Sequence, residues 1–391
     1  MAEENEELEP LAGDEALALF REGKDAWNAW ASDPENRGRP VSFDNAKFPP
    51  DKEGLIDFNG FVFPGYAWFH DAVFNAQIQF NGVTFEDGAL FAKATFRGNV
   101  NFYKPTFNGS VMFDDANFEG HTAFIEATFD GTVQFGRVRF KGNADFNRTT
   151  FEEVAWFDEA MFNSAASFQG TTFKKKAQFD RATFKWRPWF DGASFEDVVF
   201  LEDSEFLEVP DFRRTTFEKG VNLNRMAVSP GRVNVDSADK YRRLKKIAVE
   251  GKDHDREQYF FACELRAKRG FETRGLALVP NYLYEWTSDF GRSVWRPVLW
   301  LADVWLYFGL LYWWLSGREI EDLGYGFSYS ASKLFPFIGA SREMFSEARD
   351  TLFGKNAEVG LSVSSLSAIE GFLGIVFIFL IGLALRNRFR I

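Results

Sequence analysis

Cysteine and histidine are scarce in this sequence, and each scarcity excludes a class of protein. The 391 residues include one cysteine, Cys263, so no disulfide can form within the chain and nothing requires an oxidising compartment. The three histidines have no Ser-His-Asp arrangement, metal-ligand spacing or phosphate-binding loop around them. We therefore expect a protein that is not an enzyme and that binds no metal or other cofactor.

A secretory signal is not expected either, because the first ten residues, MAEENEELEP, are acidic and have no apolar run. The net charge of −12 is spread unevenly along the chain. Residues 1–42 carry 11 acidic and 4 basic side chains, residues 43–228 carry 27 and 19, and the remainder has a net charge of +3. A basic segment beside apolar ones favours contact with an anionic membrane surface.

Phenylalanine is in excess, with 48 copies concentrated before residue 220. From Phe58 to Phe217 it recurs at alternating steps of five and six residues, and Leu201 is the one exception among 30 positions. The residue two places earlier is usually small or β-branched, as at Ala72 and Val133. Residues two apart on an extended segment face the same side, so each short strand points both inward. Glycines are expected in the corners, where positive φ is useful, at Gly98, Gly109, Gly120, Gly131 and Gly142.

The alternating steps also set the number of sides in each coil. Successive coils stay in register only if the number of sides is even, and four sides give a coil of about 22 residues. Outward positions support this period, because a hydroxyl column recurs once per coil at Thr84, Thr106, Thr128, Thr150, Thr172, Ser194 and Thr216. The 30 positions then make about seven and a half coils, which at about 4.8 Å per layer gives a rod about 35 Å long.

With this spacing, roughly half of the chain resembles the pentapeptide-repeat proteins whose repeats are centred on Phe. The resemblance implies a right-handed quadrilateral β-helix over residues 43–228, in a mainly β fold that continues into α-helices. Some soluble members of this family mimic DNA and bind topoisomerases. Mimicry of that kind needs a nearly continuous negative face, which the 19 basic residues of this region interrupt.

One outward column of the repeat is mostly apolar. It contains Trp68, Leu90, Met112, Trp156 and Phe200, with glutamines at 134 and 178. The opposite column is mostly polar, as at Gln79, Asn101 and Asp145. Scattered surface hydrophobic residues are common, and this column is either an example of that or an interaction stripe for an unknown protein partner or a second copy.

Both ends of such a rod need covers, because open coils expose Phe rings and unpaired backbone. Residues 1–42 are assigned to an acidic tail and a capping helix over residues 14–31, with Asp14 as N-cap and Leu17, Phe20, Lys24, Trp27 and Ala31 on one face. Residues 229–290 are assigned to a basic helical hairpin and a linker, with Leu244, Ile247 and Val249 as the apolar face of the first helix. Its basic patch is expected to bind lipid headgroups through Lys240, Arg242, Arg243, Lys245 and Lys246.

Residues 291–391 are assigned to a membrane domain. Residues 297–316 and 363–385 are apolar enough to span a bilayer core, and residues 317–362 form a loop between them. Arginines precede the first span and follow the second, so the positive-inside rule places both termini in the cytoplasm and the loop outside. The tail also resembles that of bacterial pentapeptide-repeat membrane proteins, which implies a multi-pass protein of the bacterial cytoplasmic membrane.

The membrane domain also resembles two-span ion channels, with residues 328–339 as a candidate pore helix and its turn. The sequence departs from a potassium filter, because the GYG of Gly324, Tyr325 and Gly326 precedes that helix, and we interpret it as a loop turn. Two acids lie inside the spans, Asp303 towards the inner side and Glu370 towards the outer side. Either they have a function or each reaches water near an interface. The small residues Ser367, Gly371 and Gly374 favour close helix packing.

These features lead to one main hypothesis and two alternatives. The main hypothesis is a non-enzymatic, membrane-anchored scaffold that presents a rigid cytoplasmic β-helix to protein partners. The first alternative is an oligomeric, ion-channel-like protein with the β-helix as its cytoplasmic domain, and the second is a DNA mimic. Nucleic acid itself is not expected as a partner, because the sequence has no groove-reading element besides the basic helix.

Overall fold

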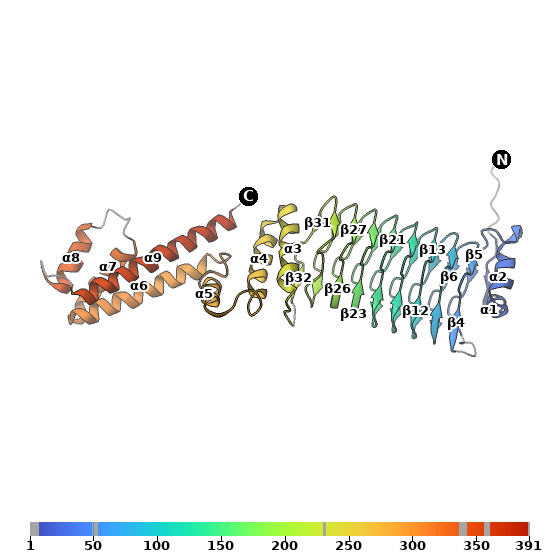
Figure 1. Ribbon diagram of the computed structural model, residues 1–391, viewed down its shortest axis with the longest axis horizontal. Helices are drawn as coiled ribbons and strands as arrows, with labels where there is room; N and C mark the ends of the chain where they lie inside the picture. The colour runs from blue at the N-terminus through green and yellow to red at the C-terminus, as the bar shows by residue number, and fades with distance from the viewer. Residues whose placement is uncertain are drawn as a thin grey trace. The chain divides into compact units, whose positions relative to one another are not determined.

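The computed structural model describes residues 8–48, 50, 54–229, 232–335, 342–355 and 360–389. It divides the chain into two compact units, residues 1–260 and residues 261–391 (Figure 1). The first unit contains the Phe repeat with helices at both of its ends. The second unit consists of helices.

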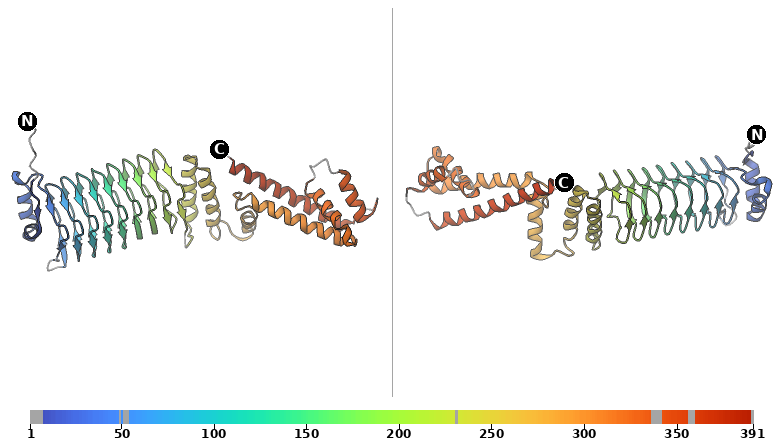
Figure 2. Two further views of the ribbon diagram at one scale, coloured as in Figure 1. Left: turned by 180° about the vertical axis from the view of Figure 1, so that it is seen from behind. Right: turned by 90° about the horizontal axis from the view of Figure 1, so that it is seen from above.

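The repeat folds into a parallel β-solenoid, a stack of coils made from short strands (Figures 1 and 2). One sheet contains β1 (Leu11–Ala12), β2 (Val41–Ser42), β6 (Ala67–Trp68), β10 (Ala89–Leu90), β14 (Val111–Met112), β18 (Val133–Gln134), β22 (Ala155–Trp156), β25 (Ala177–Gln178), β28 (Val199–Phe200) and β31 (Val221–Asn222). A second contains β5 (Val62–Phe63), β9 (Thr84–Phe85), β13 (Thr106–Phe107), β17 (Thr128–Phe129), β21 (Thr150–Phe151), β24 (Thr172–Phe173), β27 (Ser194–Phe195) and β30 (Thr216–Phe217).

The third sheet has 14 strands and covers the two remaining sides of the coil. One side contains β3 (Lys47–Phe48), β7 (Val73–Phe74), β11 (Thr95–Phe96), β15 (Asn117–Phe118), β19 (Arg139–Phe140), β23 (Met161–Ser167), β26 (Thr183–Trp189), β29 (Glu205–Phe206) and β32 (Ala227–Val228). The other contains β4 (Leu55–Asp57), β8 (Gln77–Gln79), β12 (Val100–Asn101), β16 (Thr122–Ala123) and β20 (Ala144–Asp145). Residues paired between neighbouring coils, such as Thr106 with Thr128, have the separation that the sequence pattern predicts, so the four-sided coil is confirmed.

The core of the solenoid consists of stacked Phe rings. Phe80 and Phe102, one coil apart, have ring centroids 4.5 Å apart and planes 4° from parallel. Neighbouring columns meet edge to face, as Phe80 does with Phe91 at 6.0 Å. These rings are fully buried. Burial of one Phe stabilises a fold by about 1.5–3 kcal/mol, so the repetition of Phe is the main source of stability in this unit.

The corners of the coil show that the role predicted for the glycines is wrong. The left-handed backbone positions of one corner are occupied by charged residues instead, with φ between 52° and 59° at Asp71, Lys93, Asp115, Arg137, Glu159, Arg181, Asp203 and Arg225. A Cβ on Gly120 would lie 2.5 Å from the carbonyl oxygen of Gly98 in the previous coil, and one on Gly142 would lie 2.3 Å from that of Gly120. Glycine is therefore needed in this column because the backbones of successive coils approach closely.

The same column explains why two strands are longer than the others. After Gly142 the column continues with Ser164 and Trp186, which have side chains. At these positions β23 and β26 run through the corner as seven-residue strands, and their pairing shifts register between Phe162 and Ala165. The tight turn is replaced by extended backbone at these two positions.

Helices cover the first coil of the solenoid (Figure 1). The single helix predicted over residues 14–31 is two helices, α1 (Gly13–Glu22) and α2 (Lys24–Ala31), followed by the short η1 (Pro34–Asn36). They are separated by Gly23 at φ 93°, and the N-cap is Ala12 rather than Asp14. The change of direction lets Phe20 stack on Phe58 at 4.5 Å and Trp27 on Phe43 at 5.9 Å.

At the other end, α3 (Ser237–Glu250) and the first turns of α4 (His254–Ala267) cover the last coil. Leu244 and Ile247 are buried as predicted, whereas Val249 is 50% exposed, so its predicted place on the apolar face is wrong. Tyr259 of α4 donates a hydrogen bond to the carbonyl of Val228 at 3.0 Å, and Arg256 to that of Met226 at 2.8 Å. Side chains thus satisfy carbonyls that lack a following coil.

The second unit contains η2 (Gly275–Ala277), α5 (Leu278–Ser288), α6 (Trp295–Ser316), η3 (Ile320–Asp322), α7 (Leu323–Leu334), α8 (Arg342–Phe353) and α9 (Leu361–Arg388). α7 packs against both long helices, α6 and α9. A Cβ on Gly326 of α7 would lie 2.4 Å from the carbonyl oxygen of Gly309 on α6, and one on Gly374 of α9 would lie 3.0 Å from that of Leu334. Small residues therefore seat α7 between the two long helices.

Two expectations about this unit are revised. Gly324, Tyr325 and Gly326 lie in the first turn of α7, so the interpretation of GYG as a loop turn is wrong. α7 overlaps the candidate pore helix over residues 328–334, and residues 336–339, its predicted turn, lie outside the described residues. The region predicted as a linker contains a helix, α5.

Candidate functional sites

The predicted interaction stripe is a continuous column on one sheet of the solenoid. Trp68, Leu90 and Met112 pair in register on β6, β10 and β14, and the column continues through Gln134, Trp156, Gln178 and Phe200. Trp156 is 37% exposed and the others are partly exposed. The stripe ends at Ser42 on one side and Asn222 on the other, so polar residues bound it.

A charge ladder follows one corner of the solenoid, formed by the left-handed positions from Asp71 to Arg225. Its signs alternate from coil to coil, and ion pairs join Arg137 to Asp115 at 2.8 Å and Arg181 to Glu159 at 3.0 Å. Hydrogen bonding with Arg137 lowers the pKa of Asp115 below its usual value. Water screens such exposed pairs, so each contributes little stability. The alternation instead disfavours a shift of one coil, which would place like charges together.

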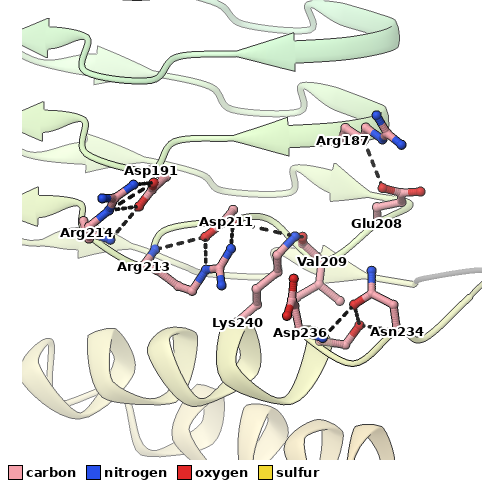
Figure 3. A network of polar contacts seen from close by, with 11 residues as sticks. Arg187, Asp191, Glu208, Val209, Asp211, Arg213, Arg214, Asn234, Asp236 and Lys240 are labelled. Carbon is pink, nitrogen blue, oxygen red and sulfur yellow. Dashed lines mark hydrogen bonds and ion pairs between the residues drawn. The ribbon is translucent and has the colours of Figure 1, made fainter.

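The basic patch predicted on residues 240–246 does not form one lipid-binding face. Arg243 donates hydrogen bonds to the carbonyls of Phe212 at 3.1 Å and Thr215 at 2.6 Å. Lys240 reaches the carbonyl of Val209 at 3.4 Å, and its Nζ lies 3.9 Å from the carboxylate of Asp211 (Figure 3). Two of the five cations therefore face the last coil, whose carbonyls have no following coil to bond.

The other three cations of this patch are turned away from the last coil or make local pairs. Arg242 pairs with Asp239, one turn earlier on α3. Lys246 lies 3.7 Å from Glu250 and its side chain is 67% exposed. Lys245 is half-buried on α3 and takes part in further interactions. A lipid contact of Arg242, Lys245 and Lys246 stays a prediction.

A polar cluster closes the last coils of the solenoid, as Figure 3 shows. Arg213 makes a two-pronged contact with the buried Asp211, with hydrogen bonds of 2.9 and 2.7 Å, and this contact raises the pKa of Arg213. Arg214 pairs with Asp191 of the previous coil and thereby lowers the pKa of that carboxyl group. The cluster has a structural role, because its charges are paired with one another.

The corner of β26 carries an aromatic and basic surface that sequence reasoning did not assign. Trp186 is 49% exposed, and the guanidinium of Arg187 lies 5.9 Å from its ring and 5.7 Å from that of Trp189. A cavity of about 440 Å³ beside them is lined by Lys185, Trp186, Leu207, Glu208 and Arg232. The sequence signal for this surface is Trp186, which stands in the column that has glycine at positions 98, 120 and 142.

Glu370 has no exposed surface, less than any other described acid of the second unit. Tyr312 of α6 donates a hydrogen bond to one of its oxygens at 2.8 Å, and Ser330 of α7 contacts the other. The Tyr312 hydroxyl also lies 3.3 Å from that of Ser367 on α9. The carboxyl group therefore joins α6, α7 and α9, and the interpretation that Glu370 reaches water near an interface is wrong.

The Ser330 hydroxyl lies between the Glu370 carboxyl group and a backbone carbonyl. The Ser330 hydroxyl has one hydrogen, and it contacts both the carbonyl of Trp305 at 3.1 Å and Glu370. Ser330 therefore either shares this hydrogen between the two acceptors or accepts a proton from Glu370. The nearby Lys333 has its Nζ 4.6 Å from the ring centroid of Tyr329, another aromatic residue of this core.

Asp303 is in a different environment. It lies on the exposed side of α6, and no ion pair or hydrogen bond joins it to Glu370 among the described residues. Tyr312, the α6 residue bonded to Glu370, lies nine positions further on, about 13 Å along a helix axis. Because Glu370 is bonded at the level of Tyr312, it lies at a different depth from Asp303, as the sequence predicts.

Two helices of the second unit are long and apolar enough to cross a membrane by length and composition. α6 has a mean hydropathy of 1.4 and α9 of 2.5 in their most apolar windows, of which 17% and 22% is buried. The core helix of a soluble protein is mostly buried, and these two are not. Large apolar side chains are exposed along them, among them Leu299, Tyr307, Trp314, Phe372 and Phe379.

The fold and the side-chain pattern define a class, the parallel β-solenoids with a four-sided coil and a Phe-filled core. A family model described as pentapeptide repeats (9 copies) matches residues 58–104, 102–150 and 179–226. The first unit thus contains pentapeptide repeats, and the C-terminal unit carries two candidate membrane helices. The coils continue through residues 151–178, between the matched segments. No curated protein and no solved structure matches the chain.

Proposed function

We propose that this protein is a membrane-anchored scaffold whose solenoid presents its outer faces to a protein partner. The observation that carries the proposal is the way the solenoid is built. Its interior is filled with stacked Phe rings and both of its ends are covered by helices. A binding site on this unit therefore has to lie on an outer face, where the stripe from Trp68 to Phe200 is an aligned apolar column.

Attachment to the membrane is the second part of the proposal. It is supported by the exposed apolar surface of α6 and α9, which would be unfavourable in water. A solenoid fixed at a membrane offers a partner a rigid surface at a defined place, without chemistry of its own. Among the described residues, no group of three or more His, Cys, Asp or Glu side chains is arranged to hold a metal ion.

Proximity labelling with the full chain in cells tests the scaffold role. Replacing Trp68, Trp156 and Phe200 with Ser should remove specific proteins from the labelled set, because the apolar column is interrupted at both ends and near its middle. The matched control replaces Thr84, Thr128 and Thr172 with Ser on a neighbouring sheet and should leave the set unchanged. A labelled set that contains bulk membrane neighbours alone, or that ignores both variants, would contradict the proposal.

A second candidate function is that of an oligomeric ion-channel-like protein. It is favoured by the position of α7, a short helix seated between two long ones around Glu370. Tyr312 and Tyr329 occupy the centre of this bundle, so a conducting path would lie between copies. Purified protein in planar bilayers should then conduct, with altered conductance in Glu370→Gln. No current together with a monomeric state in nanodiscs would exclude this function.

The DNA-mimic function has less support. The charge ladder alternates in sign along the solenoid, whereas DNA presents the same charge at every step. A gyrase supercoiling assay with the full chain should show no inhibition, and inhibition would favour mimicry over the scaffold.

A further inference from the structure

α5 is an amphipathic helix with one exposed apolar face. Val279, Tyr282, Leu283 and Trp286 recur at three- and four-residue spacing, and each is between 50% and 62% exposed. Leu276, just before the helix, is 88% exposed. Large apolar residues that are scattered singly on a surface are common, but a full helical face is not. This face therefore requires an occupant.

The opposite side of α5 is polar and firmly held. Glu285 accepts a hydrogen bond from Arg266 at 2.6 Å, and its carboxylate lies 2.5 Å from the guanidinium of Arg269. Arg269 also donates to Asn281 at 2.7 Å. Burial opposes the ionisation of Glu285, but hydrogen bonds from the two arginines lower its pKa overall. These contacts fix which face of α5 points outward.

Contacts with α6 and α9 fix the position of α5 along the axes of these two helices. Trp286 packs edge-on against Trp300 in the first turns of α6, with ring centroids 4.4 Å apart. Arg296 donates to the carbonyl of Glu285 at 3.0 Å. Just after α5, the carbonyl of Gly291 accepts a hydrogen bond from Asn387 in the last turn of α9 at 3.2 Å. α5 is thus held where α6 begins and α9 ends.

That level is where a spanning helix passes from the bilayer core into the headgroup region. Trp and Tyr are enriched there, because their rings are apolar and their N–H and O–H groups can stay hydrated. A cavity of about 400 Å³ lies at the border between the apolar and polar sides of α5, lined by Tyr282, Leu283, Glu285, Trp286 and Arg296. Its apolar wall suits acyl chains, and the arginine at its edge suits a lipid phosphate.

We propose that α5 is an interfacial helix, whose face of Val279, Tyr282, Leu283 and Trp286 is covered by the phospholipid headgroup and acyl boundary of the leaflet that α6 enters. The occupant is lipid because α5 is joined to a candidate span by six residues, one of which, Gly291, accepts a hydrogen bond from the end of the other candidate span. The proposal rests on the membrane attachment proposed above and adds a lipid contact at α5 to the one predicted for Arg242, Lys245 and Lys246.

Spin-label accessibility in phospholipid nanodiscs tests this placement with the full chain. Cys263→Ser provides a background without native thiols, into which Leu283→Cys is introduced and labelled. Glu218→Cys on the solenoid serves as the aqueous control, and Leu306→Cys on the exposed side of α6 as the bilayer-core control. The label at Leu283 should collide with dissolved oxygen several-fold more, relative to a water-soluble nickel chelate, than the label at Glu218 and less than that at Leu306.

The outcomes separate the possible occupants. Access to the nickel chelate equal to that of Glu218 would place α5 in water and overturn the proposal. Low access to both reagents would show that protein covers the face, from a second copy or another chain, and would also overturn it. If the label at Leu306 is accessible to the chelate, the membrane attachment itself fails, and the interfacial placement of α5 fails with it.

Discussion

At the residue scale, Glu370 is the side chain whose place the sequence indicated least. In the sequence it is an acid near the start of an apolar segment, which fits either a functional group or a residue that reaches water. In the fold it bonds to hydroxyl groups from two other helices. A buried carboxyl group without these partners would be unfavourable. Its bonds to Tyr312 and Ser330 therefore favour the arrangement in which α7 lies between α6 and α9.

This arrangement predicts a difference between two substitutions. Glu370→Gln should be tolerated, because the amide can donate to Ser330 and accept from Tyr312. Glu370→Leu leaves both hydroxyls without that partner and should destabilise the second unit by about 1–3 kcal/mol. Thermal unfolding of the full chain in detergent, followed by circular dichroism, measures the difference. Ile369→Leu, at an exposed neighbouring position, is the control, and equal stability of the Gln and Leu variants would contradict the role of Glu370.

At the element scale, α3 shows how composition misleads when the partner surface is unknown. Several cations on a helix beside apolar segments predict a lipid-binding helix. The sequence does not indicate which side of α3 faces the solenoid. The last coil decides this, since its carbonyls have no following coil to bond. Arg243 and Lys240 supply donors to them. The positive charge of α3 is used partly to close the solenoid.

Arg243→Ala is therefore expected to destabilise the solenoid. The variant leaves the carbonyls of Phe212 and Thr215 without these donors, at a cost of about 1–3 kcal/mol. Lys246→Ala, on the same helix with its side chain 67% exposed, should change stability by less than about 0.5 kcal/mol. Urea unfolding of the full chain in detergent compares them. A similar loss in both variants, or in neither, would show that the contacts of Arg243 do not stabilise the last coil.

At the scale of the whole molecule, the chain joins a water-exposed solenoid to a unit with two candidate spans. Arg292 and Arg296 lie before α6 and in its first turn, and Arg386 and Arg388 lie at the end of α9. Positive residues stay on the cytoplasmic side, so we expect the solenoid in the cytoplasm and the segment between α6 and α9 outside. This orientation is part of the proposed function.

Thiol labelling in intact cells tests the orientation. In the Cys263→Ser background, Glu321→Cys, between the two long helices, should react with a membrane-impermeant maleimide. Glu218→Cys on the solenoid should react only after the membrane is permeabilised. The reverse pattern would place the solenoid outside, and labelling of both positions in intact cells would show that the chain does not span the membrane as proposed.

The Phe spacing by itself determined the four-sided coil, the register between coils and the contents of the core. Each is a consequence of local repetition, since a residue contacts its counterpart one coil away wherever the period holds. The tertiary structure decided what depends on unrelated segments meeting. It showed that the corner glycines serve close approach, that Arg243 turns inward, that Glu370 joins three helices and that α5 has an outward apolar face. None of these follows from spacing, because the partner in each contact lies at no fixed separation along the chain.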